Sequence, residues 1–506
     1  MHLKAGPVHL NYEKGFLRTM TVDGLEVLRM IYFALRNRDW NTAHVEILNE
    51  TVHAQADSFG ITYDWQTDDL GMHMAGNVRL EGQVDGTIIV DFYGRATADF
   101  WRNRVGLCVL HPIQGLAGQP CVIDSPDGRT TTGVFPHLIA PYQPFLQVQT
   151  MRWQLASRQY RVDFSGDVFE TEDQRNWTDA SYKTYSTPLD QPYPVDVRAG
   201  TEVSQRVVFR PEELSAPQSP VYVIAQTEMK PEEEYCQNTT LRIGLGHRPD
   251  GPALTTDEAQ LLQRIGLSHL RADVWLSDAH WQANLHKAVR DAHLLGLPLE
   301  LAAFWGADAA AEARLLSEFV RNQRVPLYSI LLFQESTSTT TDQLLDRIVP
   351  LLRHDLPGVL LGGGTDGNFV DLNRHRFNFG QVDFVTYSIN PQVHASDNQT
   401  ILENVAGQAD TVRSARALSG DKPVHISPVT LLPRYNPDAA PSGARDVPPI
   451  DPRLSNDFGA EWTRQSIQSL TEAGAASVTY YETHGPRGLV NGSEAYPLLD
   501  VLRSIR

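Results

Sequence analysis

The chain has 506 residues, of which 41% are hydrophobic and 21% charged, a balance typical of folded domains and not of disordered chains. Its 61 acidic residues outnumber 43 basic ones, which gives a net charge of −18. Nucleic acids and anionic membranes both require a basic surface, so neither is expected as a partner. A neutral small molecule fits this composition better, and the composition leaves the oligomeric state open.

The first residues, MHLKAGPVHLNYEKG, lack the apolar core of a signal peptide, and no run of 18 apolar residues follows. We therefore expect a cytoplasmic protein. Its three cysteines, Cys108, Cys121 and Cys236, show no spacing typical of zinc sites or redox pairs, so no disulfide framework is expected.

Up to residue 235, short runs of alternating apolar and polar residues are separated by Gly, Asp and Asn. This period of two is typical of antiparallel strands, with one short helix candidate near residues 23–35. We predict a β-sandwich-like domain over residues 1–235. The acidic stretch KPEEEYCQN (230–238) is the expected junction. The clearest strand runs are residues 77–96, 157–171 and 200–210.

From Thr240 onward, short apolar strands alternate with amphipathic helices, a pattern that indicates parallel βα units. The units could also form a doubly wound open sheet. Eight in succession, followed by the helix YPLLDVLRSIR, favour a (β/α)8 TIM barrel over residues 236–506. The predicted strands are 240–246, 268–276, 298–306, 327–335, 358–366, 382–390, 423–432 and 476–485, and the clearest helices are 257–266, 280–296, 311–323 and 460–474.

Enzymes built on barrels place their sites at the carboxyl ends of the strands. Polar and aromatic side chains gather there in this sequence, and we take them as candidate site residues. They are Arg271 and Asp273 near the end of strand two, Trp305 on strand three, Glu335 on strand four, Asp366 on strand five, Asn390 and His394 after strand six, Arg434 after strand seven, and Glu482 and His484 after strand eight.

Four of these candidates are carboxylates, and we assign general acid and base catalysis to two of them. Glu482, within YYETHGPRG, follows an apolar strand where no helix cap explains it, so we take it as the catalytic base and Glu335 as the catalytic acid. The other eight are expected to bind substrate. Structural alternatives stay open, because Arg271 and Asp273 could form a salt bridge and Glu335 could cap a helix. His394 could equally bind a loop carbonyl.

Several motifs fail on inspection. GGGTDG (362–367) fits the dinucleotide fingerprint, but it falls in the fifth of eight units, and Asp366 would repel a pyrophosphate. There is no G-x-S-x-G elbow and no H-x-H after the first strand. A metal held by Asp273, His394 and Glu482 is not indicated, so we expect no metal and no cofactor.

One segment of the first half is unusual for a sandwich. FETEDQRNWTDASYKTYSTPL (169–189) combines charged and aromatic residues within a short stretch, among them Glu172, Asp173, Arg175, Asp179 and Lys183. It is either a hydrogen-bonded loop that bridges the domains or a segment that reaches the barrel mouth and contacts substrate.

Four long blocks resemble the D-apionate lactonase family of bacterial apiose catabolism: this segment, GRATADFWRNRVGLCVLHP, FVTYSINPQVHASD and SVTYYETHGPRG. The resemblance covers nearly the whole chain. It implies a β-rich N-terminal domain, a TIM barrel, and hydrolysis of D-apionolactone to D-apionate. Family members carry a further small β domain after the barrel, whereas this sequence ends with the expected last barrel helix.

We therefore expect a sugar lactonase in which a carboxylate activates water, with a small neutral carbohydrate or sugar lactone as its binding partner. The alternative is a TIM-barrel glycoside hydrolase that uses Glu335 and Glu482 as its carboxylate pair. Against it, strand seven, PVHISPVTLLPRY, carries no carboxylate, although retaining β-glycosidases of the large barrel clan keep their nucleophile there. A carbohydrate-binding protein without catalysis is the third hypothesis, and the many charged residues at strand ends disfavour it.

Overall fold

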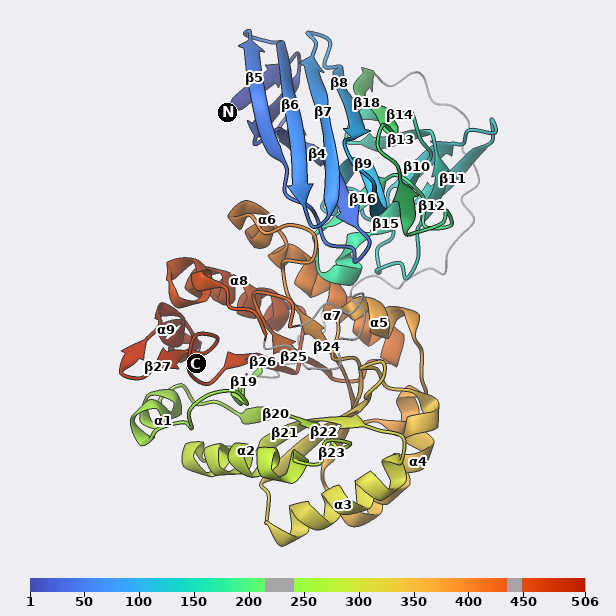
Figure 1. Cartoon of the computed structure of the whole chain (residues 1–506). Coiled ribbons are helices and arrows are strands. Elements are labelled where there is room, and N and C mark those ends of the chain that lie inside the picture. Colours follow the sequence, from blue (N-terminus) through green and yellow to red (C-terminus); the bar gives the residue numbers. More distant parts are fainter. Residues whose placement is uncertain (214–240, 435–447, 506) are drawn as a thin grey trace. The chain divides into compact units, whose positions relative to one another are not determined.

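A computed structural model of the chain describes residues 1–213, 241–434 and 448–505. These residues form two units (Figure 1). The first contains residues 1–174 and 181–213, and the second contains 175–180, 241–434 and 448–505. The boundary expected at residues 235 and 236 and the acidic junction both lie outside the described residues.

The first unit consists of two antiparallel sheets, which confirms the predicted antiparallel β-rich region. In spatial order, the first sheet contains β1 (His2–Ala5), β2 (Val8–Glu13), β3 (Phe16–Val22), β4 (Leu25–Asn37), β9 (Phe100–Pro112), β16 (Ser181–Tyr185), β15 (Phe169–Asp173) and β12 (Phe145–Val148), and β17 (Val195–Val197) also pairs with β9. The second contains β11 (Thr130–Val134), β10 (Pro120–Asp124), β13 (Thr150–Leu155), β14 (Arg158–Ser165), β18 (Glu202–Glu213), β8 (Ile88–Ala96), β7 (Met72–Gly82), β6 (Phe59–Asp69) and β5 (Glu46–Ala54).

One apolar core joins the two sheets. Phe33 of β4 lies 5.1 Å from the ring of Trp65 on β6 and 4.9 Å from that of Phe92 on β8. Trp65 and Phe92 stack with 5.4 Å between their ring centroids. Burial of such large aromatic surfaces supplies much of the stability of a domain, so this cluster holds the sheets face to face.

The helix expected near residues 23–35 was wrong, because residues 23 and 24 form a turn and residues 25–35 belong to strand β4. β4 pairs with both β3 and β9. Along β4, adjacent residues such as Val27 and Leu28 are both buried, so the strand loses the alternation that marks a half-exposed strand. A run of apolar residues buried on both faces resembles a helix in sequence.

The second unit contains a closed barrel of eight parallel strands, which confirms the predicted TIM barrel. Most residues of these strands are buried, as in parallel strands covered by helices. In order around the ring, they are β19 (Arg242–Gly246), β20 (His269–Trp275), β21 (Leu299–Trp305), β22 (Leu327–Gln334), β23 (Leu360–Gly364), β24 (Phe384–Ile389), β25 (Val424–Val429) and β26 (Ser477–Glu482).

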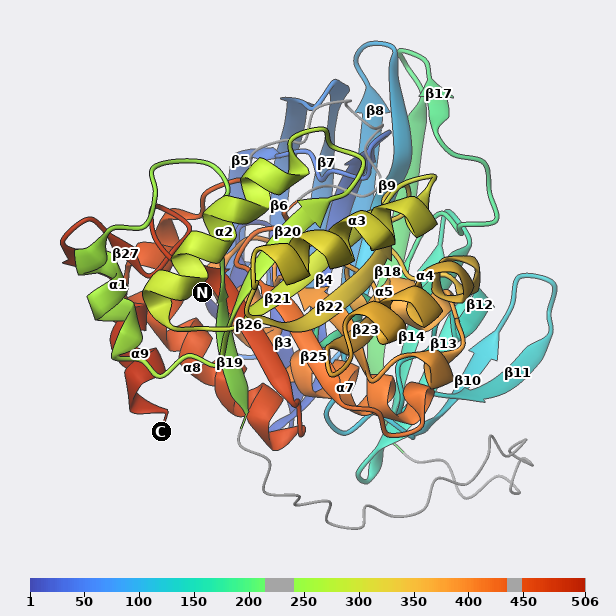
Figure 2. The ribbon, with the colours of Figure 1, turned by 90° about the horizontal axis from the view of Figure 1, so that it is seen from below.

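Helices surround this ring, and Figure 2 shows α2, α3 and α4 outside the strands β20 to β23. The α-helices are α1 (Thr256–Gln263), α2 (Trp281–Leu295), α3 (Ala309–Asn322), α4 (Asp342–Asp355), α5 (Phe369–Arg374), α6 (Asn398–Glu403), α7 (Val405–Ser419), α8 (Asp457–Glu472) and α9 (Pro497–Ser504). Shorter elements are the 3-10 helices η1 (Gln174–Trp177), η2 (Phe379–Gln381) and η3 (Pro452–Ser455) and the hairpin of β27 (Val490–Asn491) and β28 (Glu494–Ala495).

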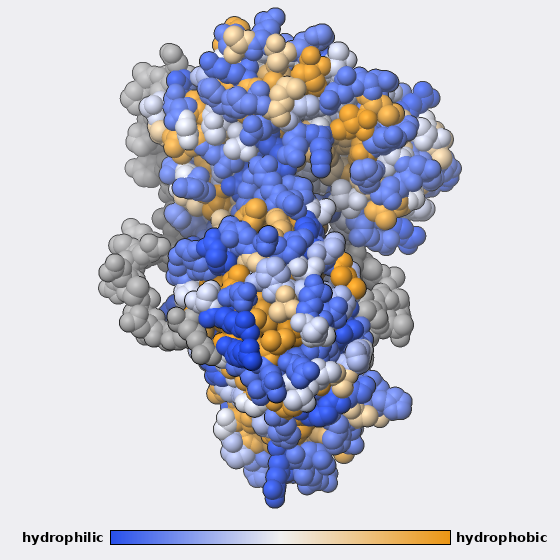
Figure 3. Space-filling view, turned by 90° about the vertical axis from the view of Figure 1, so that its left-hand side faces the viewer, coloured by the Kyte–Doolittle hydropathy of each residue, from blue (hydrophilic) through white to orange (hydrophobic). Residues whose placement is uncertain are grey.

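The face in Figure 3 is largely hydrophilic, with apolar residues scattered among polar ones. Within the described residues, no helix combines the length and apolar character needed to cross a bilayer.

The aromatic core of the first unit provides a test of the fold. Phe92→Ala removes a ring that contacts both sheets, so we expect it to lower the free energy of unfolding by about 3–5 kcal/mol. The matched control is Leu146→Ala, which removes an exposed apolar side chain and should change stability by less than about 0.5 kcal/mol. Denaturant unfolding of both variants measures the difference. Equal stabilities would contradict the assigned core.

Candidate active site

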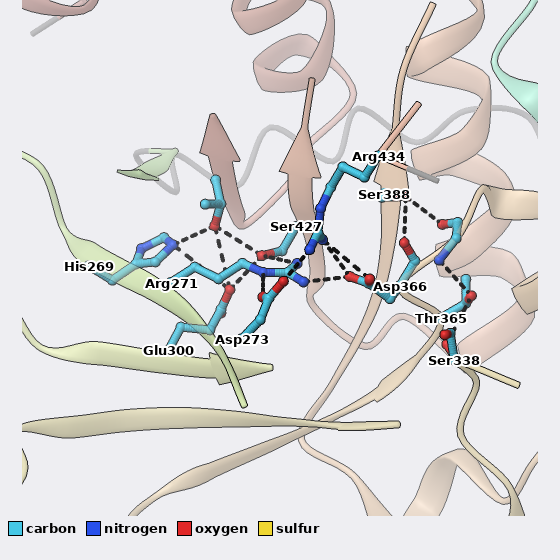
Figure 4. Close-up of polar contacts among 12 residues, drawn as sticks. His269, Arg271, Asp273, Glu300, Ser338, Thr365, Asp366, Ser388, Ser427 and Arg434 are labelled. Carbon is cyan, nitrogen blue, oxygen red and sulfur yellow. Dashed lines mark hydrogen bonds and ion pairs between the residues drawn. The ribbon is translucent and has the colours of Figure 1, made fainter. Parts of the chain in front are cut away.

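Four charged side chains form a closed ring of ion pairs inside the barrel (Figure 4). Arg271 Nε donates to Asp273 Oδ1 at 2.9 Å, and Arg271 Nη2 donates to Asp366 Oδ1 at 2.5 Å. Arg434 closes the ring from the other side, with hydrogen bonds to Asp366 at 3.0 and 3.2 Å and a contact with Asp273. Two positive and two negative charges therefore neutralise one another within the barrel.

Burial makes these pairings necessary, because an unpaired charge in a protein interior is costly. Burial alone would raise the pKa of Asp273, but the charges of Arg271 and Arg434 hold it below its usual value. The Arg271 side chain is 2% exposed and that of Arg434 is 19% exposed, so Arg434 is the more accessible cation of the ring.

A second polar group continues deeper in the barrel and is centred on Glu300 of β21. Ser427 of β25 donates to Glu300 Oε1 at 2.6 Å and accepts from Arg271 Nη1 at 3.2 Å, so it links Glu300 to the charge ring. Ser329 of β22 donates to Glu300 Oε2 at 3.2 Å. His269 Nε2 lies 2.8 Å from Thr479 Oγ1 on β26 (Figure 4).

These contacts keep Glu300 ionised. Burial alone would raise its pKa, but the neighbouring His425 and His269 imidazoles and the hydrogen bond from Ser427 lower it well below its usual value. Burial also lowers the pKa of His269 to about 4, so His269 is neutral at pH 7. Glu300 is therefore a buried anion held mainly by hydroxyl and imidazole groups.

Glu482 points toward the barrel interior because of a bulge in β26. Tyr481 has a φ of 47°, and the pairing with β19 shifts register at this point. Tyr480 and Tyr481 contact Ser466 and Thr463 respectively, both on α8, so two successive side chains face the helices. Strand alternation then returns Glu482 to the side of Thr479, which faces the interior.

The register also places Glu482 at the level of Arg271. Both are paired with Gly246 of β19, one from each side. Since neighbouring strands lie about 4.8 Å apart, the two backbones are separated by roughly 10 Å. Gly246 has no side chain to occupy the space between them.

The Glu482 carboxyl has one bound oxygen and one that is not bound. Arg487 Nε donates to Oε1 at 2.9 Å, whereas buried Oε2 has no hydrogen-bond partner among the residues that the structure describes. Burial raises the pKa of Glu482, and Arg487 opposes this shift only in part. A carboxylate with a raised pKa is a stronger base, so this oxygen is suited to accepting a proton.

Two further candidates lie at the carboxyl ends of β21 and β22. Glu335 comes directly after Gln334, the last residue of β22, in a turn, and its backbone N–H donates to the Trp305 carbonyl at 2.9 Å. Trp305 is fully buried and lies on the opposite face of β21 from Phe304. Phe304 stacks on Trp275 with 4.5 Å between the ring centroids. The substrate-binding role of Trp305 stays a prediction.

The remaining candidates have separate partners. Asn390 Nδ2 donates to Asn368 Oδ1 at 3.1 Å. His394 Nδ1 contacts Asp179, and His484 is buried with Nε2 2.9 Å from the Pro252 carbonyl and Nδ1 3.0 Å from Thr483 Oγ1. A carbonyl can only accept, so His484 Nε2 carries its proton.

The structure thus joins Arg271, Asp273, Asp366 and Arg434 directly. It confirms the salt bridge weighed for Arg271 and Asp273 and extends it to a ring. Asp273, His394 and Glu482 have different partners, and the described part of the chain contains no cluster of three or more residues able to hold a metal.

Sequence reasoning missed Glu300 and Ser427. A charged residue inside the apolar run LELAAFW was the available signal for Glu300.

Two family models match this chain. The model of the D-apionate lactonase N-terminal domain matches residues 1–214, and that of the D-apionate lactonase TIM barrel domain matches residues 243–506. The chain belongs to the D-apionate lactonase family. A D-apionate lactonase of Brucella anthropi is 31% identical over 524 aligned positions, which cover 98% of this chain and 84% of the relative.

Solved structures resemble the family member only weakly. A family 39 glycoside hydrolase from Bacteroides cellulosilyticus WH2 is 10% identical with a TM-score of 0.36, over 77% of both chains. A family 17 β-1,3-glucanosyltransferase from Rhizomucor miehei is 13% identical with a TM-score of 0.36, over 52% of this chain and 97% of that one. Values this low carry no argument about activity.

The ionised state of Glu300 leads to a prediction about stability. Because its pKa is lowered on folding, Glu300 stabilises the fold above pH 4.3, roughly its unfolded pKa, and the contribution is lost as the pH falls further. Glu300→Gln should therefore cost about 1.5–3 kcal/mol at pH 7 and progressively less below about pH 4. Urea unfolding across this range measures the effect. The matched control is Glu318→Gln at an exposed position, which should change stability little at pH 7 and below pH 4. If the destabilisation by Glu300→Gln instead grew as the pH fell, Glu300 would not be the buried anion described above.

Proposed function

We propose that this protein is a sugar lactonase that hydrolyses D-apionolactone to D-apionate. Membership of the D-apionate lactonase family and the relative in Brucella anthropi support this substrate. The observation that carries the mechanism is the Glu482 carboxyl, which faces the barrel interior with a raised pKa and with Oε2 unbound within the described residues.

In the proposed reaction, Glu482 removes a proton from water as the water oxygen attacks the lactone carbonyl carbon. A carbon–oxygen bond forms, and the carbonyl oxygen becomes an oxyanion. The bond from this carbon to the ring oxygen then breaks. Glu335, which follows β22 at the carboxyl end of the barrel, donates a proton to the departing oxygen. The product is an open-chain hydroxy acid, and its carboxylic acid releases one proton at neutral pH.

The oxyanion needs a cationic or hydrogen-bond donor nearby. Arg271 and His484 are both buried, whereas the Arg434 and His394 side chains are 19% and 15% exposed. We therefore take Arg434 and His394 as the candidate donors. The charge ring then serves mainly to hold Arg434 in place.

Glu482→Gln tests the proposed base. The amide cannot accept a proton from water, so we expect kcat for D-apionolactone to fall by about 10²–10⁴. The matched control is Glu494→Gln, a change at an exposed position of β28, which should leave the rate unchanged. A pH-stat follows the acid released by hydrolysis. In the wild type, kcat should fall as the pH drops through the raised pKa of Glu482, because the protonated carboxyl is no longer a base.

The substrate class is tested with the same protein. A panel of aldonolactones and aryl glycosides should show turnover of lactones only, with D-apionolactone the best substrate. A wild-type rate in Glu482→Gln would remove Glu482 from the mechanism. Release of sugar from aryl glycosides without lactone hydrolysis would instead favour a glycoside hydrolase.

A further inference from the structure

Residues 175–180 precede the barrel by more than 60 positions in the sequence, yet they group with the second unit. Arg175 Nη1 donates to Asp410 Oδ2 of α7 at 3.0 Å, and Asn176 Oδ1 accepts from Asn373 Nδ2 of α5 at 3.0 Å. The Ala180 N–H donates to Asn404 Oδ1 at 3.2 Å. The segment is therefore fixed at both of its ends.

Its backbone also fits closely against α7. A Cβ at Gly407 would lie 2.8 Å from the Thr178 carbonyl oxygen, so only glycine permits this approach. Thr178 has a φ of 72°, which L-residues rarely adopt. Unusual backbone conformations of this kind persist where the surrounding contacts enforce them. Here they bring the next residue, Asp179, to the loop that follows β24.

Both oxygens of the Asp179 carboxylate are occupied. Asn404 Nδ2 donates to Oδ1 at 2.5 Å, and His394 Nδ1 contacts Oδ2. The Asp179 side chain is 5% exposed, so it cannot turn away to solvent. A carboxylate only accepts, so His394 Nδ1 carries a proton and the ring orientation is set by Asp179. Trp177 supports the ring edge-on, with 5.5 Å between the centroids.

We propose that Asp179 is a positioning residue that holds His394 as an imidazolium, and that His394 Nε2–H donates to the lactone carbonyl oxygen as the oxyanion forms. His394 keeps its proton throughout, so it acts as an electrostatic donor and not as an acid or a base. This inference rests on the proposed lactonase function. It also assigns a role to the 175–180 segment, which would complete the barrel's site.

The charges around His394 favour this protonation state. Asp179 is the carboxylate in contact with the ring, and an adjacent carboxylate stabilises an imidazolium. Arg374 lies 5.4 Å from the centroid of the Trp177 ring, the ring that packs against His394. In the loop that carries His394, the Asp397 side chain caps α6. Arg453 of η3 donates to the Ser396 carbonyl of this loop at 2.8 Å, so both charged side chains have partners other than His394.

Asp179→Asn is the direct test. Without the carboxylate, His394 should lose its proton at lower pH, so the alkaline limb of the kcat profile should move to lower pH and kcat should fall by about 10²–10³. The matched control is Asp410→Asn, which removes the negative charge of the Arg175 anchor in the same segment but does not touch His394. The amide oxygen can still accept from the Arg175 guanidinium, so this variant should keep the alkaline limb of the wild type and lower kcat by less than about threefold.

NMR of ¹⁵N-labelled histidine separates this inference from the proposed function, because it needs no turnover. The His394 ring should titrate at higher pH in the wild type than in Asp179→Asn. If Asp179→Asn does not fold, His394→Gln provides the second test and should abolish the alkaline limb. A wild-type pH profile and rate in either variant would overturn the inference. Failure of the wild type to hydrolyse any lactone, with the His394 titration as expected, would refute the proposed function instead.

Discussion

The barrel interior depends on one constraint, which is that two arginines and two aspartates buried in it must neutralise one another. Arg271 and Asp273 come from one strand, whereas Asp366 and Arg434 come from two different loops. Burial of any one of these charges without its partners would cost several kcal/mol. The ring therefore ties together the carboxyl ends of β20, β23 and β25, and it fixes the position of the most exposed member, Arg434.

The same requirement explains the polar groups on either side of the ring. Glu300 stays ionised deeper in the barrel because Ser427, Ser329 and the neighbouring imidazoles surround it. Glu482 is different. Its Oε1 is paired with Arg487, but Oε2 is buried without a hydrogen-bond partner in the described chain, and its pKa is raised. An unsatisfied carboxyl oxygen beside a paired charge network is where a reacting water would gain most by binding.

Much of the fold could be predicted from the sequence. Parallel strands buried on both faces leave apolar runs, and all eight barrel strands were found in this way, whereas the same kind of run in β4 was mistaken for a helix. The long motifs also identified the family correctly. Within the site, Arg271 and Asp273 are two positions apart on one strand, so their side chains share a face and their salt bridge could be predicted.

Other parts of the site could not be read from sequence, for physical reasons. Asp366 and Arg434 meet the β20 pair across 95 and 161 residues, and only barrel closure brings them together. The direction of Glu482 depends on the bulge at Tyr481, which simple alternation does not reveal. Glu300 was missed because it lies inside a strand and not at its end. The role of Asp179 could not be predicted because its partner, His394, lies 215 residues further along the sequence.

The most direct test of the account is a crystal structure of the Glu482→Gln variant with D-apionolactone bound. The account predicts the lactone at the carboxyl end of the barrel, with a water about 3–3.5 Å from its carbonyl carbon and within hydrogen-bond distance of the substituted amide side chain. A lactone bound elsewhere, with that side chain facing only Arg487, would contradict it.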